Sequence, residues 1–392
     1  MGCTMANVLF EYIAKEAMDN ITALLYGEYD EVVYFYFPDE PEQDVRDEAL
    51  GRFVTEKLNT ALRYFEIPER TADAVVWSFK TVMEEHPEED RFVIETTGGA
   101  ELFLVAGGML LAEAGARVSF CNYSGVRNEE RKMVRELTVD DVISLQGCKI
   151  VAVCDGRKID YLNGDFRNEV MKLWNAVKTI SADWNRFAML TTDEHPDSPF
   201  THGKTFSGEQ DRVISKRIME KLAKTQIICD YQLDKVSVNR FRLQYSFGKL
   251  AKTPALYEKS GTVLEMFTCM AAAESGLFRD CMSGVSLDAD GIICGTAEET
   301  RNEIDVLMLR GNRPVFVSCK NTRPTKEYLY EIMAMAQHYG GAYAIPALVA
   351  SADTFPAVAE RAEEMGVILI DRVAEKTLRE LKDELRKAFE DK

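Results

Sequence analysis

Short apolar runs alternate with helix-length stretches through residues 6–148, and this alternation restricts the fold more than any other feature of the chain. The runs at 31–37, 91–95 and 116–121 are short enough for strands, and apolar residues recur at helical spacing between them. Strand alternating with helix predicts a parallel sheet covered on both faces. Because such sheets bind ligands at the carboxyl ends of their strands, residues 1–148 are predicted to form a Rossmann-like domain with any ligand at that edge.

The rest of the chain has two further patterns, as expected for the two or three domains of a 392-residue protein. In residues 149–255, a helical pattern at 208–224 leads into two alternating segments, 226–233 and 236–245, and a helix followed by a hairpin resembles a winged-helix unit. Residues 256–392 return to mixed helices and strands. The predicted fold class is therefore α/β, with a Rossmann-like domain, a winged-helix-like middle region and a C-terminal α/β domain.

The charge balance and the cysteines narrow the class of protein. A net charge of -18 argues against a protein that simply coats nucleic acid, although it is compatible with a local basic groove. The 9 Cys have no CxxC spacing and the 4 His are scattered, so we expect reduced thiols packed as small hydrophobes. No apolar run approaches the ~18 residues of a membrane span. We expect a cytoplasmic protein that does not enter a membrane.

One segment at a strand end has residues suited to a phosphate. Thr96 and Thr97 end a predicted strand, Gly98 and Gly99 follow, and Glu101 lies at the start of the next helix. Unpaired amides at a helix N-terminus attract anions, and glycines let a ligand approach the main chain. The simpler interpretation is that Thr97 caps the helix and the glycines form a tight turn. The segment is neither a GxGxxG motif nor a P-loop.

Three residues of the C-terminal region are predicted to converge. Glu265 lies on a predicted helix over residues 261–273, Asp305 interrupts the apolar face of a strand, and Lys320 ends the following strand. Residues 310–313 have the composition of a tight turn, so the two strands are expected to form a hairpin. Carboxylates that hold Mg²⁺ or Mn²⁺ beside a lysine suit phosphodiester hydrolysis, because the metal activates a water and the lysine neutralises developing charge. The alternative is a solvated ion pair.

The two motifs and their order resemble a known family. The helix Glu, the strand Asp and the strand-terminal Lys resemble the PD-(D/E)xK nucleases, whose domain is restriction-endonuclease-like. The strand–Thr-Gly-Gly-x-Glu–helix junction is similar to the ligand signature of the CRISPR-associated Rossmann fold (CARF). A sensor of this kind before such a nuclease, with a winged-helix-like middle, resembles the CARF-linked ancillary nucleases of type III CRISPR systems, over nearly the whole chain.

The resemblance implies an activity and a set of residues. It implies a homodimer that binds cyclic oligoadenylate, in particular cyclic tetra-adenylate, and then cuts RNA or DNA, with single strands preferred. Glu265, Asp305 and Lys320 match the catalytic positions of the family. The implied ligand-binding residues are Thr96, Thr97, Gly98, Gly99, Glu101 and, on the first helix, Asn20.

The chain departs from the family pattern at Ser318, where a carboxylate is expected two residues before the lysine. A hydroxyl is a weaker metal ligand than a carboxylate. We expect Mn²⁺ or Mg²⁺ to be held instead by Glu265, Asp305 and the main-chain carbonyl of Cys319, with Glu303 as a less certain participant.

Two other functions remain open from the sequence. A winged-helix transcriptional regulator that senses a ligand would not need the predicted catalytic residues, but it would need a basic recognition helix. Lys216, Arg217, Lys221 and Lys224 make the helix predicted at 208–224 somewhat basic. The other alternative is a nucleic-acid repair enzyme that no small molecule controls.

Overall fold

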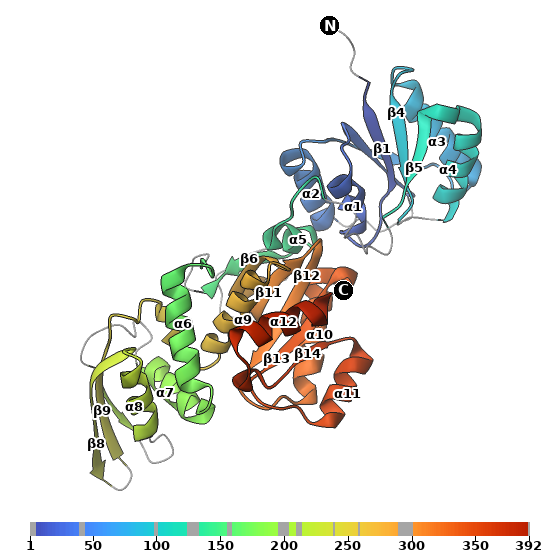
Figure 1. Ribbon diagram of the computed structural model, residues 1–392. Coiled ribbons are helices and arrows are strands. Elements are labelled where there is room, and N and C mark those ends of the chain that lie inside the picture. Colours follow the sequence, from blue (N-terminus) through green and yellow to red (C-terminus); the bar gives the residue numbers. More distant parts are fainter. Residues whose placement is uncertain are drawn as a thin grey trace. The chain divides into compact units, whose positions relative to one another are not determined.

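The computed structural model shows two compact units (Figure 1). The first unit consists of Met1–Cys148 with Gly341–Tyr343, and the second consists of Lys149–Gly340 with Ala344–Lys392. The structure describes residues 5–38, 44–97, 101–123, 133–154, 159–194, 204–208, 214–237, 240–257, 259–288 and 301–390. Gly98 and Gly99 of the predicted ligand segment lie outside the described residues.

The first unit contains a five-stranded parallel sheet with the strand order β3-β2-β1-β4-β5. The strands are β1 (Asn7–Tyr12), β2 (Glu31–Tyr36), β3 (Ala61–Glu66), β4 (Arg91–Glu95) and β5 (Val118–Cys121). The chain builds outward from β1 to β3 and then returns to add β4 on the other side of β1. The direction of winding therefore reverses between β1 and β4, which is where sheets of this kind bind ligands. The predicted Rossmann-like fold is confirmed.

Helices cover the sheet of the first unit (Figure 1). They are α1 (Asp19–Tyr26), α2 (Asp44–Arg52), α3 (Ala72–Glu84) and α4 (Glu101–Ala114), and a further helix, α5 (Val139–Leu145), contacts α2. A phenylalanine-rich core joins α3 and α4 to one face, where the ring centroids of Phe79 and Phe103 are 4.9 Å apart and those of Phe10 and Phe79 are 5.3 Å apart. On the other face, the Tyr34 hydroxyl of β2 donates to the main-chain carbonyl of Asn20 on α1.

The second unit is built on a six-stranded mixed sheet with the order β14-β13-β12-β11-β10-β6. The strands are β6 (Lys149–Ala152), β10 (Arg279–Asp288), β11 (Arg301–Arg310), β12 (Arg313–Lys320), β13 (Ile345–Ala350) and β14 (Ile368–Ile370). β6, β10, β11 and β12 pair in antiparallel fashion, whereas β12, β13 and β14 are parallel. The predicted hairpin therefore consists of β11 and β12, with Gly311 in its turn at a φ of +63°.

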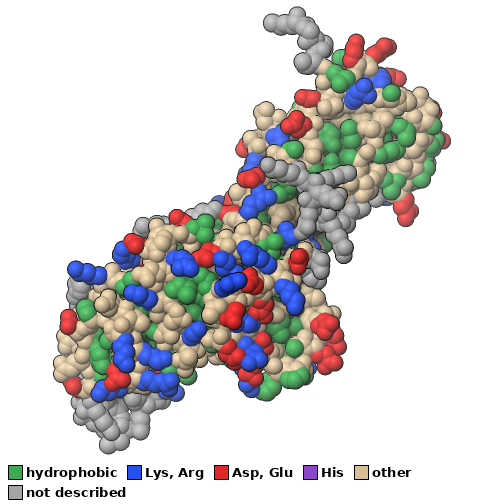
Figure 2. Space-filling model, in the orientation of Figure 1, with side chains coloured by type: hydrophobic (Ala, Val, Ile, Leu, Met, Phe, Trp, Pro, Cys, Tyr) green, Lys and Arg blue, Asp and Glu red, His purple; other side chains and the backbone are tan. Residues whose placement is uncertain are grey.

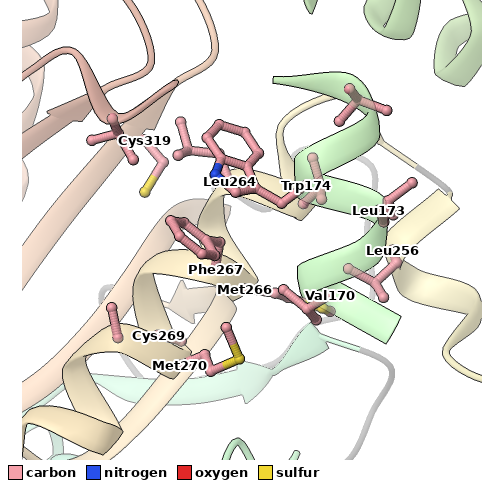
Figure 3. Packing of buried hydrophobic residues seen from close by; sticks show 14 of the residues in the cluster. Val170, Leu173, Trp174, Leu256, Leu264, Met266, Phe267, Cys269, Met270 and Cys319 are labelled. Atoms are coloured by element: carbon pink, nitrogen blue, oxygen red, sulfur yellow. The ribbon is translucent and has the colours of Figure 1, made fainter. Parts of the chain in front are cut away.

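Helix α9 is the centre of the second unit. Its bounds, Thr262–Ser275, agree with the predicted helix at 261–273, and most of its side chains are buried. It packs against β10, β11, β12 and α6 (Gly164–Val177). Trp174 of α6 stacks on Phe267 of α9 with ring centroids 5.2 Å apart (Figure 3). The remaining helices on this sheet are α10 (Lys326–Gly340), α11 (Pro356–Met365) and α12 (Leu378–Phe389).

The middle region has the predicted order of a helix followed by a hairpin. α8 (Lys216–Lys224) precedes β8 (Ile228–Ser237) and β9 (Arg240–Phe247), and β7 (Lys204–Gly208) completes a three-stranded sheet in the order β7-β9-β8. Helix α7 (Ser181–Glu194) precedes β7 in the chain. The helix predicted at 208–224 is shorter than expected, because the Ser215 hydroxyl caps α8 by accepting from the Ile218 amide. Within the described ranges, no helix is both long and apolar enough to cross a membrane.

Candidate functional site

The β11–β12 hairpin brings Asp305 and Lys320 together, as predicted. Val306 pairs with Val317 in the antiparallel ladder, so Asp305 and Ser318 occupy the next positions toward the end of β12. The Lys320 Nζ lies 4.0 Å from Asp305 Oδ2, and these side chains keep 26% and 21% of their surface exposed. Both groups are therefore accessible from solvent.

The main chain and side chain of β12 hold the Asp305 carboxylate in place. Oδ2 accepts hydrogen bonds from the Cys319 amide at 2.6 Å and from the Ser318 hydroxyl at 3.2 Å. Burial raises the pKa of Asp305 above its usual range, although the positive charge of Lys320 and these hydrogen bonds oppose the rise. The carboxylate is thus fixed in orientation but remains poorly compensated for its burial.

Glu265 lies close enough to this pair to interact with both charges, in the first turn of α9, with only 6% of its surface exposed. Burial raises its pKa well above the ordinary value, and the negative charges of Asp305 and Glu303 raise it further. Gly261 leaves room for the carboxylate, because a Cβ there would lie 2.8 Å from Glu265 Oε1. The three residues predicted to converge therefore do so, and the positive charges of Lys259 and Lys320 only partly offset the rise in the pKa of Glu265.

This donor set fits a divalent cation. Two carboxylates whose pKa values are raised by burial, and at Glu265 also by the charge of Asp305, are stabilised when a cation lies between them. Among the described residues, however, no group of three or more His, Cys, Asp or Glu side chains is arranged to hold a metal. A cation held by Glu265 and Asp305 would therefore need main-chain oxygen or water for its other ligands.

The structure also places the other residues that the sequence suggested near a metal. The Cys319 side chain turns into the core beside α9, with Sγ 3.9 Å from Thr268 Oγ1, so only its main chain faces Asp305 (Figure 3). Glu303 is engaged elsewhere, because Lys259 Nζ lies 2.6 and 2.7 Å from its two carboxylate oxygens. Ser318, in the usual carboxylate position, uses its hydroxyl to orient Asp305.

Further residues frame the site and were not predicted from the sequence. Asn321, directly after Lys320, is 7% exposed and donates from Nδ2 to Asn185 Oδ1 of α7 at 3.2 Å. Trp184, also on α7, donates from Nε1 to the carbonyl of Ser260, just before α9, at 3.0 Å. Helix α7 thus ties together the two segments that carry Lys320 and Glu265.

An aromatic ring holds the lysine of the site. Lys320 Nζ lies over the ring of Tyr328 on α10, 4.6 Å from its centroid. An ammonium group over an aromatic ring is attracted by the partial negative potential of the ring face. Lys320 is thus oriented by Asp305 on one side and by Tyr328 on the other.

In the first unit, Thr96 and Thr97 lie where β4 ends, as predicted, and they join the ends of β4 and β5. Thr96 donates from Oγ1 to the carbonyl of Cys121 at 3.0 Å, and Thr97 Oγ1 accepts from the Tyr123 amide at 2.7 Å. Thr97 Oγ1 is therefore engaged by the segment that follows β5. Glu101 is the exposed first residue of α4.

Asn20 closes the loop between β1 and α1. Its Nδ2 donates to the carbonyl of Ala14 at 2.9 Å, and its Oδ1 accepts from the Ala14 amide at 2.6 Å. The oxygen and the nitrogen of this buried amide are thus both bonded within the loop, so Asn20 shapes the carboxyl edge of the sheet.

A buried pair of acids lies at the same edge and was not predicted from the sequence. Glu11 on β1 and Glu95 on β4 are the next positions after the paired Phe10 and Ile94, and each is 2% exposed. Burial raises the pKa of Glu11 well above its usual range, and the charges of Glu95 and Asp19 add to the rise. Among the described residues, Glu11 Oε2 has no hydrogen-bond partner.

Comparison with known proteins places the fold. By sequence, the chain matches no family model and no curated protein. By structure, it is similar to protein VC1899 from Vibrio cholerae, with a TM-score of 0.71, 15% identity and 98% of each chain covered. It is also similar to Can2 from Sulfobacillus thermosulfidooxidans in complex with cyclic tetra-adenylate, with a TM-score of 0.65, 13% identity, and 98% of this chain and 97% of Can2 covered. The likeness in fold extends over 98% of the chain, and the predicted fold class is confirmed.

Proposed function

We propose that the chain is a nuclease of the CARF-linked kind: a cyclic oligoadenylate activates it, and it cleaves RNA or DNA with a divalent metal. The observation that carries the proposal is the convergence of buried Glu265 with the half-buried Asp305 and Lys320 at the end of a hairpin. The full-length similarity to Can2, a protein solved with cyclic tetra-adenylate, supports the sensor half of the proposal.

The residues of the second unit have distinct tasks in this mechanism. Glu265, Asp305 and the Cys319 carbonyl would hold Mn²⁺ or Mg²⁺, which when bound supplies a Lewis acid and an ionised water. The Ser318 hydroxyl and the Cys319 amide keep Asp305 in one orientation. Lys320, held beside Asp305 and Tyr328, offsets the negative charge that develops on the phosphate during cleavage.

The first unit supports a homodimer. α4 exposes an apolar face on which Leu104, Val105, Met109 and Leu111 are 40%, 55%, 39% and 37% exposed. Figure 2 shows hydrophobic side chains gathered over this part of the first unit. Contiguous exposed apolar surface marks an interaction site, and a second copy of the same face would cover it symmetrically. Such a dimer would place two ligand edges around one two-fold axis, which suits a cyclic tetra-adenylate.

The test is a cleavage assay with labelled RNA and DNA, in single- and double-stranded forms. Each is incubated with Mn²⁺ or Mg²⁺, with or without cyclic tetra-adenylate and cyclic hexa-adenylate. We expect single strands to be cut only when metal and one cyclic ligand are present. Cleavage without ligand would favour the ungated repair enzyme. If the protein binds duplex DNA and cleaves nothing under any of these conditions, the winged-helix regulator is favoured. The basic residues of α8 are those that the recognition helix of such a regulator would need.

A further inference from the structure

Helix α8 has a charge pattern that the proposed nuclease site does not use. Its Lys216, Arg217, Lys221 and Lys224, here called the α8 basic face, stand against a single acid, Glu220, in a chain with a net charge of -18. Figure 2 shows Lys and Arg side chains gathered over the part of the second unit that contains α8. A positive surface on a strongly acidic protein calls for an explanation, because most of the molecule repels anions.

The packing of α8 turns these cations outward. Ile218, Met219 and Leu222 are buried in the core of the second unit. Lys216, Arg217 and Lys224 are exposed on the other side of the helix. Partial burial lowers the pKa of Lys221, and the positive charges of Arg217 and Lys224 lower it further. These cations are therefore close enough to repel one another, and a bound polyanion would relieve that repulsion.

Helix α12 shows that this pattern is not a general feature of the helices of this protein. α12 carries Arg379, Lys382, Arg386 and Lys387, but Glu380, Asp383 and Glu384 lie among them. Three of its cations are paired: Arg379 and Arg386 lie 3.9 and 3.5 Å from Asp383, and Lys382 lies 3.1 Å from Glu274. On α8, by comparison, Lys216 pairs with Glu220 at 3.7 Å.

The α8 basic face is part of the same packed unit as the candidate active site. Lys221 Nζ donates to Thr179 Oγ1 at 2.7 Å, in the turn between α6 and α7. From there, α7 contacts both segments of the site through Trp184 and Asn185. A strand bound on α8 would therefore be held in a fixed relation to Lys320.

We propose that the α8 basic face binds the phosphate backbone of the single strand that the second unit cleaves, as a docking surface separate from the cleavage site. Lysine and arginine side chains that contact phosphates, and not the edges of bases, bind a strand whatever its sequence. The release of counterions from the strand favours this binding. The inference rests on the proposed function only in naming the strand as the substrate.

The test measures binding without cleavage. Fluorescence anisotropy of a labelled single-stranded oligonucleotide is recorded in EDTA over a series of salt concentrations, so the result does not depend on nuclease activity. The double variant Arg217→Ala/Lys224→Ala is compared with wild type and with the matched control Arg379→Ala/Lys387→Ala, which removes the same charge from exposed positions of α12. Thermal unfolding of both variants checks that they remain folded.

We expect the α8 variant to bind on the order of ten-fold more weakly near 0.1 M salt. Its slope of log K against log salt should be lower by ~0.7 for each phosphate that the variant no longer neutralises, while the control keeps the wild-type slope. Equal affinity in all three proteins, or an equal loss in both variants, would overturn the inference. So would α8-dependent binding of duplex in preference to single strands. If the α8 variant loses binding but wild type cleaves nothing, the docking surface stands and the nuclease assignment fails.

Discussion

At the scale of single residues, two acids on the same strand are expected to differ in their effect on cleavage. Asp305 and Glu303 lie two positions apart on β11, but Asp305 faces Lys320 whereas Glu303 pairs with Lys259. We predict that Asp305→Asn reduces cleavage at least ~100-fold, the order expected when one electrostatic group of a site is removed. Glu303→Gln should change the rate only a few-fold, because exposed ion pairs contribute little. Equal losses in the two variants would remove Asp305 from its assigned role.

Ser318 offers a second test, because it stands where a carboxylate is expected. Its hydroxyl donates to Asp305 at 3.2 Å, so Ser318→Asp would place a third negative charge beside two buried carboxylates. We predict that Ser318→Asp has a lower melting temperature than wild type in EDTA and gains more stability from added Mn²⁺. Ser318→Ala, which loses one hydrogen bond worth about 1 kcal/mol, should show no such gain. If Mn²⁺ stabilises all three proteins equally, Ser318 does not lie at the metal position.

Glu11 predicts a pH dependence of stability. Its pKa is raised in the folded protein by burial and by Glu95, so the folded state holds its proton more tightly than the unfolded chain does. Its contribution is therefore fully present below the ordinary pKa of a glutamate and is lost as the pH rises through the raised value. We predict that Glu11→Gln, which keeps the shape without the charge, melts at a higher temperature than wild type at pH 8 and that the difference shrinks toward pH 5. A difference that grows on acidification would contradict this prediction.

At the scale of elements, the exposed face of α4 predicts the oligomeric state. Leu104 and Met109 are exposed and apolar on a helix whose other side is buried. The variant Leu104→Glu/Met109→Glu should sediment as a monomer if wild type is a dimer, because a charge in an apolar interface is costly. Leu162→Glu is the control, since Leu162 is 62% exposed in the second unit. A wild-type monomer, or a dimer unaffected by the α4 variant, would exclude this interface.

At the scale of the whole molecule, gating requires that the ligand favour the active arrangement over the inactive one. We predict that cyclic tetra-adenylate raises the melting temperature of wild type and that Gly98→Val, which blocks approach to the main chain, removes this shift. The variant should lose ligand-stimulated cleavage and keep any background activity, because Glu265, Asp305 and Lys320 are unchanged. Equal stabilisation of both proteins would exclude the segment after β4 as the sensor.

Local sequence patterns determined much of the fold and the core of the candidate site. Alternating apolar runs predicted the parallel sheet, and the tight turn at 310–313 brought Asp305 and Lys320 into proximity because a hairpin pairs segments that are close along the chain. β3 was missed because it is the edge strand of its sheet and lacks an apolar run, with exposed and half-buried residues along its length. The ligand role of Gly98 and Gly99 stays a prediction.

Only the tertiary structure decided which distant segments meet. Glu11 and Glu95 lie side by side because β4 returns to pair with β1, and β6 joins the sheet of the second unit by pairing with β10. α7 reaches Ser260 and Asn321, which are 76 and 136 residues from its contacting side chains. Strands pair through backbone groups that every residue but proline carries in full, so long-range pairing leaves no local signature. The sequence therefore determined which groups could do the chemistry, and the packing of distant elements decided which of them are buried together.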